Sequence, residues 1–247
     1  MLELLSALAE RGTTGASPVL TQAIKDAQPE VRREALKALI EVGTQTDVPV
    51  LLAFLNSAET DAERDQAGRA LASACRRSGG NGLTQVITAY SSAAGSEARQ
   101  ALVAVVGNVG SKEGLPLLTG ALKDSDTAVR RAAILALGEW PDGEPLSDLL
   151  ATARDESVPA HHILALRSYL KLVSLPVERP AAESVRLVSG AIQTARDPEL
   201  KKAALAVLPR FVCQEAVDVA AAAAADSAVK AEADQAVKRL KEAMGNR

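Results

Sequence analysis

The sequence predicts an all-α fold, an α-solenoid in which about seven similar helix pairs stack on one another. Alanine is abundant while only 2% of the residues are aromatic, which favours helices that pack closely on small side chains. The phrase KDAQPEVRREALKALIEVG at Lys25–Gly43 returns in similar form as KDSDTAVRRAAILALGEW at Lys123–Trp140. Residues that cap helices recur in the same register, which places the start of each repeated helix.

The repeated phrase has an anchor position, mostly apolar, that returns about every 30 residues along the chain. Four and eight residues after each anchor come mostly a small and then a large apolar residue, with His162 as an exception. Spacings of four and eight lie on one face of a helix, so we expect this face to be buried. The anchors are Val31, Glu63, Ala98, Val129, Val158, Leu200 and Val229.

Each repeated helix has a start signal three residues before its anchor. Most of these residues are strong N-cap types, because a short polar side chain can accept a hydrogen bond from a free N–H of the first turn. They are Gln28, Thr60, Gly95, Asp126, Asp155, Asp197 and Asp226. A first helix precedes each of these second helices, and four of the first helices carry a proline near the start, at Pro18, Pro49, Pro116 and Pro145.

We interpret residues 1–247 as a single repeat domain that forms a right-handed superhelix, because helix pairs of this kind bury their apolar faces only by stacking. Met1–Arg11 is expected to be a single capping helix. Ser78–Gly82 and Ser174–Ser184 are expected to be a short and a long loop between repeats. The approximate repeats are 13–45, 46–80, 81–112, 113–142, 143–175, 181–213 and 214–247.

The composition argues against several classes of protein. The net charge is −3 and the isoelectric point about 5.6, so we expect no nucleic acid partner and no attraction to an anionic membrane. Cys75 and Cys213 are too few for a disulfide framework or a cysteine zinc site. The N-terminal stretch lacks the basic region of a signal peptide, and no apolar run reaches the length of a membrane span. We expect a soluble monomer, cytoplasmic by default and exported if the chain belongs to a longer precursor.

The phrase DxxVRxxAxxAL at Asp126–Leu137 resembles HEAT repeats, specifically the short bacterial phycobilisome-lyase-type HEAT-like repeats. The resemblance extends over nearly the whole chain. It is weaker where Glu63 replaces the apolar anchor and where Pro159 and His162 interrupt the pattern. It implies the solenoid fold, and it implies a binding scaffold more than any particular reaction.

A basic residue directly follows the anchor in every repeat except the fifth, where Pro159 stands. These residues are Arg32, Arg64, Arg99, Arg130, Lys201 and Lys230. One interpretation is a stripe that binds phosphate groups. The interpretation that we favour is a structural ladder, in which each cation meets a carboxylate near a helix start, such as Asp126, Asp155, Asp197 or Asp226. The HEAT resemblance implies the ladder, because such repeats commonly use their aspartate and arginine in this way.

No catalytic motif or metal site emerges from the sequence, and we expect neither a metal nor a cofactor. Asp124 and Asp126 form a DxD, which supplies too few oxygens for calcium. His161 and His162 are adjacent and therefore point about 100° apart on a helix, which disfavours chelation of one ion. We expect the His162 ring to be partly buried and hydrogen-bonded, and His161 to lie on the open side.

Three aromatic residues share one column of the repeat, at Trp140, Tyr169 and Phe211. They could form a stacking platform for a base or pigment. Their column continues the buried face, so we expect them in the core. Cys75 is likewise expected to be a small buried hydrophobic side chain.

The function that we predict is a non-catalytic scaffold that binds a protein or peptide on the concave surface of the second helices. Positions three and six after each anchor lie away from the buried face and turn apolar in the middle repeats, which is typical of a contact site. The alternatives are an enzyme of the chromophore-lyase or DNA-glycosylase kind, a module of a larger protein, or burial of these positions by lateral packing. The predicted patch consists of Ala101, Ala104, Arg131, Ala132, Leu135, His161, Leu164, Arg167, Ala203 and Ala206.

Overall fold

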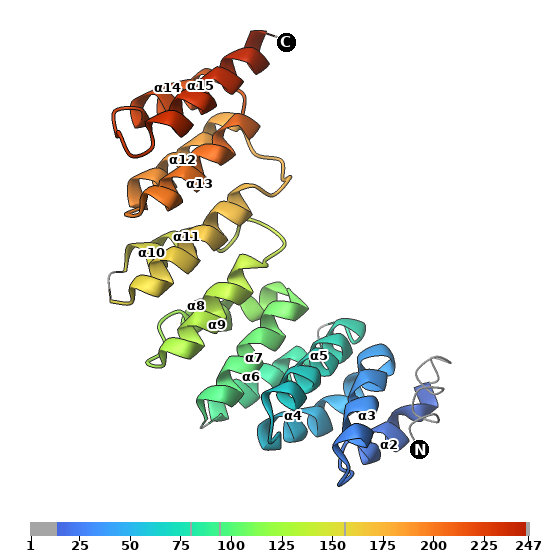
Figure 1. Cartoon of the computed structure of the whole chain (residues 1–247). Helices are drawn as coiled ribbons and strands as arrows, with labels where there is room; N and C mark the ends of the chain where they lie inside the picture. Colours follow the sequence, from blue (N-terminus) through green and yellow to red (C-terminus); the bar gives the residue numbers. More distant parts are fainter. Residues whose placement is uncertain (1–13, 80, 94, 156, 246–247) are drawn as a thin grey trace. The chain divides into compact units, whose positions relative to one another are not determined.

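The computed structural model describes residues 14–79, 81–93, 95–155 and 157–245, which contain fourteen α-helices and no strand (Figure 1). These helices form seven pairs, and the predicted all-α solenoid of helix pairs is confirmed. The first helices, called A helices below, are α2 (Ser17–Ala23), α4 (Val48–Ser57), α6 (Leu83–Ser92), α8 (Leu115–Ala121), α10 (Leu146–Arg154), α12 (Ala181–Thr194) and α14 (Gln214–Ala223). The second helices, called B helices, are α3 (Pro29–Val42), α5 (Asp61–Arg77), α7 (Ser96–Val109), α9 (Thr127–Gly138), α11 (Pro159–Val173), α13 (Pro198–Val207) and α15 (Lys230–Gly245).

The chain divides into two compact units, unit 1 from Met1 to Ala136 and unit 2 from Leu137 to Arg247. The division falls in the last turn of α9. The interpretation of residues 1–247 as one domain, and the right-handed turn of the superhelix, stay predictions.

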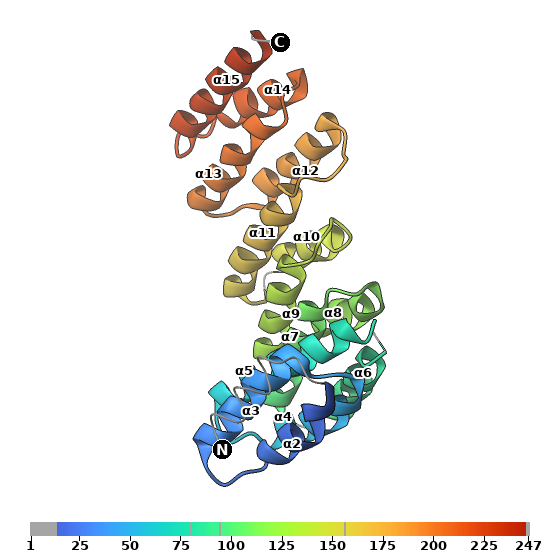
Figure 2. The same ribbon diagram turned by 90° about the vertical axis from the view of Figure 1, so that its right-hand side faces the viewer.

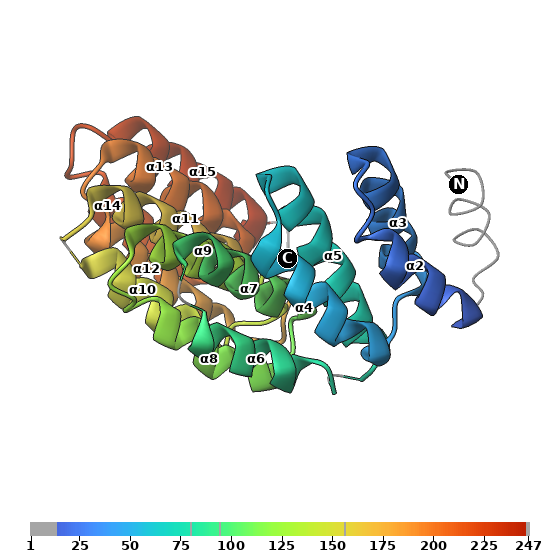
Figure 3. The same cartoon turned by 90° about the horizontal axis from the view of Figure 1, so that it is seen from below.

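Each unit has two layers of helices. In unit 1 the B helices α3, α5 and α7 contact one another in sequence, and the A helices α4 and α6 also touch (Figure 3). In unit 2 the B helices α11, α13 and α15 form one layer, and the A helices α10, α12 and α14 form the other (Figure 2). Stacking of this kind buries the apolar face that one pair alone would leave in water.

The helix starts follow the predicted signals with two exceptions. Thr60 and Asp197 are N-caps whose side chains accept backbone N–H groups of α5 and α13. α11 begins at Pro159 with Val158 as its N-cap, so the predicted cap Asp155 is wrong. The residue before a proline is pushed toward extended backbone, and Val158 has φ −137° and ψ 98°. α15 begins at Lys230, four residues after Asp226, because a turn intervenes.

The buried face of the B helices lies where the register predicts. Every residue four positions after an anchor is buried: Ala35, Ala67, Leu102, Ala133, His162, Ala204 and Ala233. Trp140 and Tyr169 are in the core, as predicted, whereas Phe211 is half-buried. Cys75 is fully buried, and burial raises the pKa of its thiol to about 11.

Small residues let neighbouring B helices approach closely at one point of unit 1. A Cβ atom built on Gly107 of α7 would lie 2.5 Å from the Cβ and 3.0 Å from the Cα of Ala136 in α9. Real Cβ atoms do not come this close to a neighbouring backbone, so a glycine is required here.

One predicted boundary segment is shorter in the structure, and another lies outside the described residues. The long loop predicted at Ser174–Ser184 is shorter, because α12 begins at Ala181 and Ser184 is a buried helical residue. The capping helix predicted at Met1–Arg11 lies outside the described residues.

In the part of the chain that the structure describes, no helix has the length and apolar character needed to cross a membrane.

Candidate functional site

The basic residues after the anchors in the first two repeats contact both their own repeat and the next one. Arg32 pairs with Glu63 at 2.7 Å and donates to the backbone oxygens of Asp26 and Ala27. Arg64 pairs with Glu97 at 2.9 Å, as well as with an acid of its own first turn. Each guanidinium therefore joins the turn before its own helix to the start of the next B helix.

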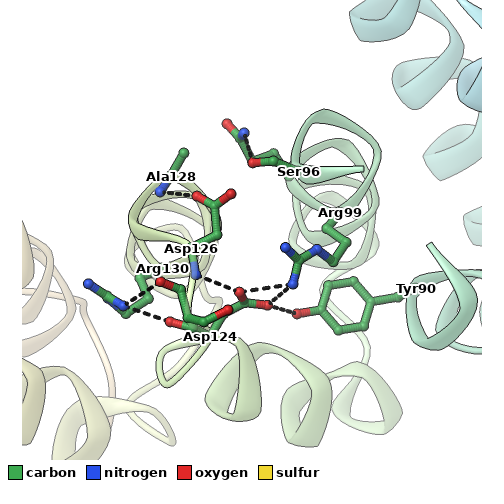
Figure 4. A network of polar contacts seen from close by, with 9 residues as sticks. Tyr90, Ser96, Arg99, Asp124, Asp126, Ala128 and Arg130 are labelled. Atoms are coloured by element: carbon green, nitrogen blue, oxygen red, sulfur yellow. Dashed lines mark hydrogen bonds and ion pairs between the residues drawn. The ribbon is translucent and has the colours of Figure 1, made fainter. Parts of the chain in front are cut away.

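Asp124 is the centre of the most connected polar network in unit 1 (Figure 4). Its carboxylate accepts two hydrogen bonds from Arg99, at 2.7 and 2.9 Å, and one from the Tyr90 hydroxyl at 3.1 Å. It also accepts the backbone N–H of Asp126 at 2.8 Å. Arg130 donates to the Asp124 backbone oxygen at 2.7 Å. The network thus connects α6, α7 and the turn before α9.

The environment of this network shifts two pKa values in opposite directions. A hydrogen bond from the Ser96 hydroxyl, followed by the N–H of Ala128, lowers the pKa of Asp126. Burial raises the pKa of Tyr90, and its hydrogen bond to Asp124 adds to this effect. Both shifts favour the protonation states that the network uses at neutral pH, an ionised Asp126 and a neutral Tyr90.

In unit 2 the same register position gives two different pairs. Lys201 of α13 reaches Asp226 in the next repeat at 2.7 Å. Lys230 instead pairs with Asp234 of its own helix at 3.3 Å. Asp155 and Asp197 accept backbone N–H groups two residues further on, from Ser157 and Glu199.

We expect the Lys201→Met substitution to raise the pKa of Asp226 toward its ordinary value of 3.8. The hydrogen bond from Lys201 is the main cause of the lowered pKa, and the N–H of Ala228 is the second. A carboxylate with a lowered pKa stabilises the fold above pH 3.8, and this contribution disappears as the pH falls through the folded-state pKa. Carboxyl-detected NMR titration measures the shift, and Lys230→Met is the matched control that leaves Asp226 unchanged. An Asp226 pKa that is the same with and without Lys201 contradicts the prediction.

Two further polar linkages were missed by the sequence reasoning. Asp47 is buried, and its carboxylate accepts the Ser17 hydroxyl and, at 2.7 Å, the N–H of Thr44. Arg77 donates to the oxygen of Gly43 after α3, and Arg76 to that of Asn108 in α7, both at 2.6 Å. Cations at these positions satisfy free carbonyl groups and complement the helix dipole. The T-x-x-D spacing of Thr44 and Asp47, which is typical of a capping box, could have indicated the first linkage.

The predicted binding patch has members in both units. In unit 1, Ala104, Arg131 and Leu135 are exposed, the last by 42%, while Ala101 and Ala132 are half-buried. In unit 2, Arg167, Ala203 and Ala206 are exposed and Leu164 is half-buried.

His161 is buried, with 7% exposure, so its predicted place on the open side is wrong. Position three after the anchor is half-buried in five other repeats, at Glu34, Gln66, Ala101, Ala132 and Glu232. Neighbouring B helices therefore cover the side of the helix on which position three lies. A projection of one helix cannot show this, because it leaves the neighbouring helices out. His162 is buried and its Nδ1 contacts the Ala153 carbonyl oxygen, as predicted.

Position six after the anchor faces solvent more consistently than position three. Only Leu164 is half-buried, and the exposed members are Lys37, Arg69, Ala104, Leu135, Ala206 and Gln235. We call the exposed side of the B helices around position six the B-helix face.

A groove of about 490 Å³ in unit 1 was also missed. Its wall is a second apolar stripe of α4, formed by Pro49, Val50, Ala53 and Phe54, and it continues to Lys25, Glu59 and the Arg32–Glu63 pair. α4 is apolar on two faces, which is the signal in the sequence VPVLLAFLNS that could have indicated a second covered side.

A family model for HEAT repeats matches residues 2–72 and 83–167 of the chain. The chain belongs to the HEAT-repeat family. HEAT repeats commonly serve as scaffolds for protein interaction. No curated protein matches the chain.

Solved structures show the same fold. YibA of Escherichia coli is 14% identical, with a TM-score of 0.51 over 96% of this chain and 85% of that chain. Kap95p, in a structure that describes its binding to RanGDP, is 14% identical with a TM-score of 0.59, over 91% of this chain and 36% of that chain. At these identities the likeness shows the fold alone.

The aromatic residues of this HEAT-repeat chain do not form an open stacking platform. All five lie in the described residues, where Trp140 and Tyr169 are buried and Phe54, Tyr90 and Phe211 are half-buried. Phe54 and Tyr90 are on A helices rather than on the B-helix face. The described residues also contain no group of three or more histidine, cysteine or acidic side chains that could hold a metal.

Proposed function

We propose that this HEAT-repeat chain is a non-catalytic scaffold that binds a protein or peptide through its B-helix face. The observation that carries this proposal is the exposure of position six, where small or apolar residues such as Ala104 and Ala206 stand in water. Small side chains leave room for a partner to approach the helix backbone. Kap95p, with a similar fold, is described as binding RanGDP, which supports protein binding as the class of function.

We also propose that the basic residues after the anchors stabilise the stack and do not bind phosphate. Arg32, Arg64, Arg99 and Lys201 each contact a carboxylate in the following repeat. The Arg99 guanidinium is already engaged by two carboxylate oxygens, so a phosphate would have to displace Asp124. An ion pair with little solvent exposure is costly to break in this way.

Selection of peptides from a displayed random library tests where the chain binds. We expect peptides that bind the B-helix face of unit 1 to lose at least 10-fold in affinity when Ala104→Trp places a large ring there, and peptides that bind the B-helix face of unit 2 to do so with Ala206→Trp. The matched control is Ala151→Trp, an exposed alanine on the A helix α10, which we expect to bind as the unchanged chain does.

The same library can contradict the proposal in two ways. Ala53→Trp fills the groove along α4 instead of the B-helix face. Binding that is lost only with Ala53→Trp would place the site in that groove, and a library that yields no binders would argue against peptide binding altogether.

A further inference from the structure

The B-helix face of unit 2 carries a row of arginines that have no ion-pair partner within the described residues. They are Arg167 on α11, Arg210 in the 3-10 turn after α13 (Leu208–Arg210), and Arg239 on α15. All three are exposed. Arg167 comes three residues after Leu164, the position-six residue of its repeat. Arg210 and Arg239 come four residues after the position-six residues Ala206 and Gln235. Residues three or four apart lie one above the other on a helix, so the three arginines extend the face that position six begins.

The three elements that carry the arginines are neighbours in unit 2. α11 contacts α13, α13 contacts α15, and the turn that holds Arg210 contacts α15 as well (Figure 2). Because successive packed helices lie about 8–10 Å apart, the arginines recur at about that interval across the layer. Ten residues after the first three anchors, the position of Arg210 and Arg239, unit 1 has Glu41, Ser73 and Asn108. Nine residues after them, the position of Arg167, it has Ile40, Ala72 and Gly107, so the row is a property of unit 2.

The acidic side chains on the same B helices do not neutralise the row, since lysines hold them. Glu199 and Glu232 both pair with Lys202, at 2.9 and 3.5 Å. Asp234 pairs with Lys230, and Glu242 with Lys238 at 4.0 Å. Within the described residues, Arg167, Arg210 and Arg239 therefore keep an unpaired positive charge on the B-helix face.

Apolar and small side chains lie beside the arginines. Ile163 is 37% exposed and Leu164 is half-buried on α11, while Ala203 and Ala206 are exposed on α13. A guanidinium binds a carboxylate through two parallel hydrogen bonds, which a row of arginines could repeat from one helix to the next. Three charges beside an apolar strip, without an exposed aromatic ring for base stacking, fit a peptide better than a nucleic acid.

We propose that the B-helix face of unit 2 binds an acidic peptide segment that runs across α11, α13 and α15, with its carboxylates on Arg167, Arg210 and Arg239. The inference rests on the proposed function and specifies its partner. A peptide in the polyproline II conformation advances about 3.1 Å per residue and completes a turn every three residues, so every third side chain lies on one side and an arginine every 8–10 Å meets about every third residue. The segment is therefore one with an acidic residue at every third position and apolar residues between, which face Ile163 and Leu164.

The probe for the experiment is a synthetic twelve-residue peptide with blocked ends, glutamate at every third position, and leucine or alanine elsewhere. We expect the full chain to bind it, and the triple variant Arg167→Gln, Arg210→Gln and Arg239→Gln to bind it at least 10-fold more weakly by fluorescence anisotropy. The control Arg186→Gln removes an exposed arginine from an A helix of the same unit and leaves binding unchanged. A thermal melt shows that the triple variant is folded, because substitutions at exposed positions cost little stability.

A charge exchange makes the test stricter. The three arginines are changed to glutamate, and the glutamates of the probe to lysine. We expect this pair to bind, and each mixed pair of like charge to fail. A probe with glutamine in place of glutamate is expected to bind at least 10-fold more weakly, and added salt should weaken the original pair because the contacts are exposed.

Several outcomes overturn the proposal. One is failure of the unchanged chain to bind the probe, and another is equal binding by the triple variant. A single-stranded oligonucleotide that binds more tightly than the probe through the same arginines would identify a nucleic-acid surface instead. Library peptides that bind the B-helix face without acidic residues would remove this inference and leave the proposed function standing. Failure of the proposed function itself would appear as insensitivity of all selected peptides to both Ala104→Trp and Ala206→Trp.

Discussion

The Asp124→Ala substitution is expected to destabilise unit 1 by about 3 kcal/mol. The carboxylate has only 9% of its side-chain surface exposed and accepts hydrogen bonds from Arg99, Tyr90 and the N–H of Asp126. Its removal leaves the partly buried Arg99 guanidinium without its ion-pair partner, which costs more than the loss of an exposed pair. Urea unfolding followed by circular dichroism measures the change.

The matched control is Asp61→Ala, which breaks a 2.6 Å pair with Arg64 at a side chain that is 97% exposed. Exposed pairs contribute little, so we expect a loss below about 1 kcal/mol. Equal destabilisation by the two substitutions would mean that the Asp124 network contributes no more than a surface ion pair. A Tyr90→Phe variant, which removes one hydroxyl, should fall between the two.

The Gly107→Ala substitution is expected to destabilise unit 1 by about 1–3 kcal/mol, although alanine is the better helix former. The added methyl group would meet the Cβ of Ala136 at 2.5 Å and its Cα at 3.0 Å, so the backbone of α7 or α9 has to move. Thermal and urea unfolding both report the loss.

Gly120 of α8 provides the opposite case, because a Cβ there would find nothing within 4 Å. Gly120→Ala should therefore stabilise by up to about 1 kcal/mol through helix propensity alone. Combining Gly107→Ala with Ala136→Gly should recover part of the loss, since the second change removes the atom that clashes. Stabilisation by Gly107→Ala itself would show that α7 and α9 are not in such close contact.

Helix pairing and the core register were predictable because their causes are local. Prolines and capping residues act within one turn, and the spacing of four and eight identifies the buried face without knowledge of a partner. The burial of Ala67 and Leu102 follows from this spacing, and so does that of His162 with its bond to a backbone oxygen. The same local reasoning erred at Asp155, where the effect of Pro159 on Val158 moved the helix start.

The candidate site was only partly predictable, because exposure depends on the neighbouring helices. Position six is exposed to solvent in every repeat except the fifth, where Leu164 is half-buried, whereas His161 at position three is buried. A projection of one helix does not show this difference. The groove beside Phe54 arises between two helix pairs, so no single segment of the sequence contains it. Lysines and arginines look alike as charges in the sequence. Only their contacts distinguish Lys202, which forms ion pairs, from Arg210, which forms none with the described residues.

The sequence by itself determined the class of fold, the place of each helix pair and the column of residues that forms the core. These depend on backbone propensity and on periodicity, which are properties of a few consecutive residues. The tertiary structure alone decided that Asp124 joins α6, α7 and the turn before α9, and that Gly107 must lack a side chain. It also decided which arginines have no ion-pair partner among the described residues. Such features depend on distances between helices that are far apart in the chain, and these distances are set by how side chains pack across the layers.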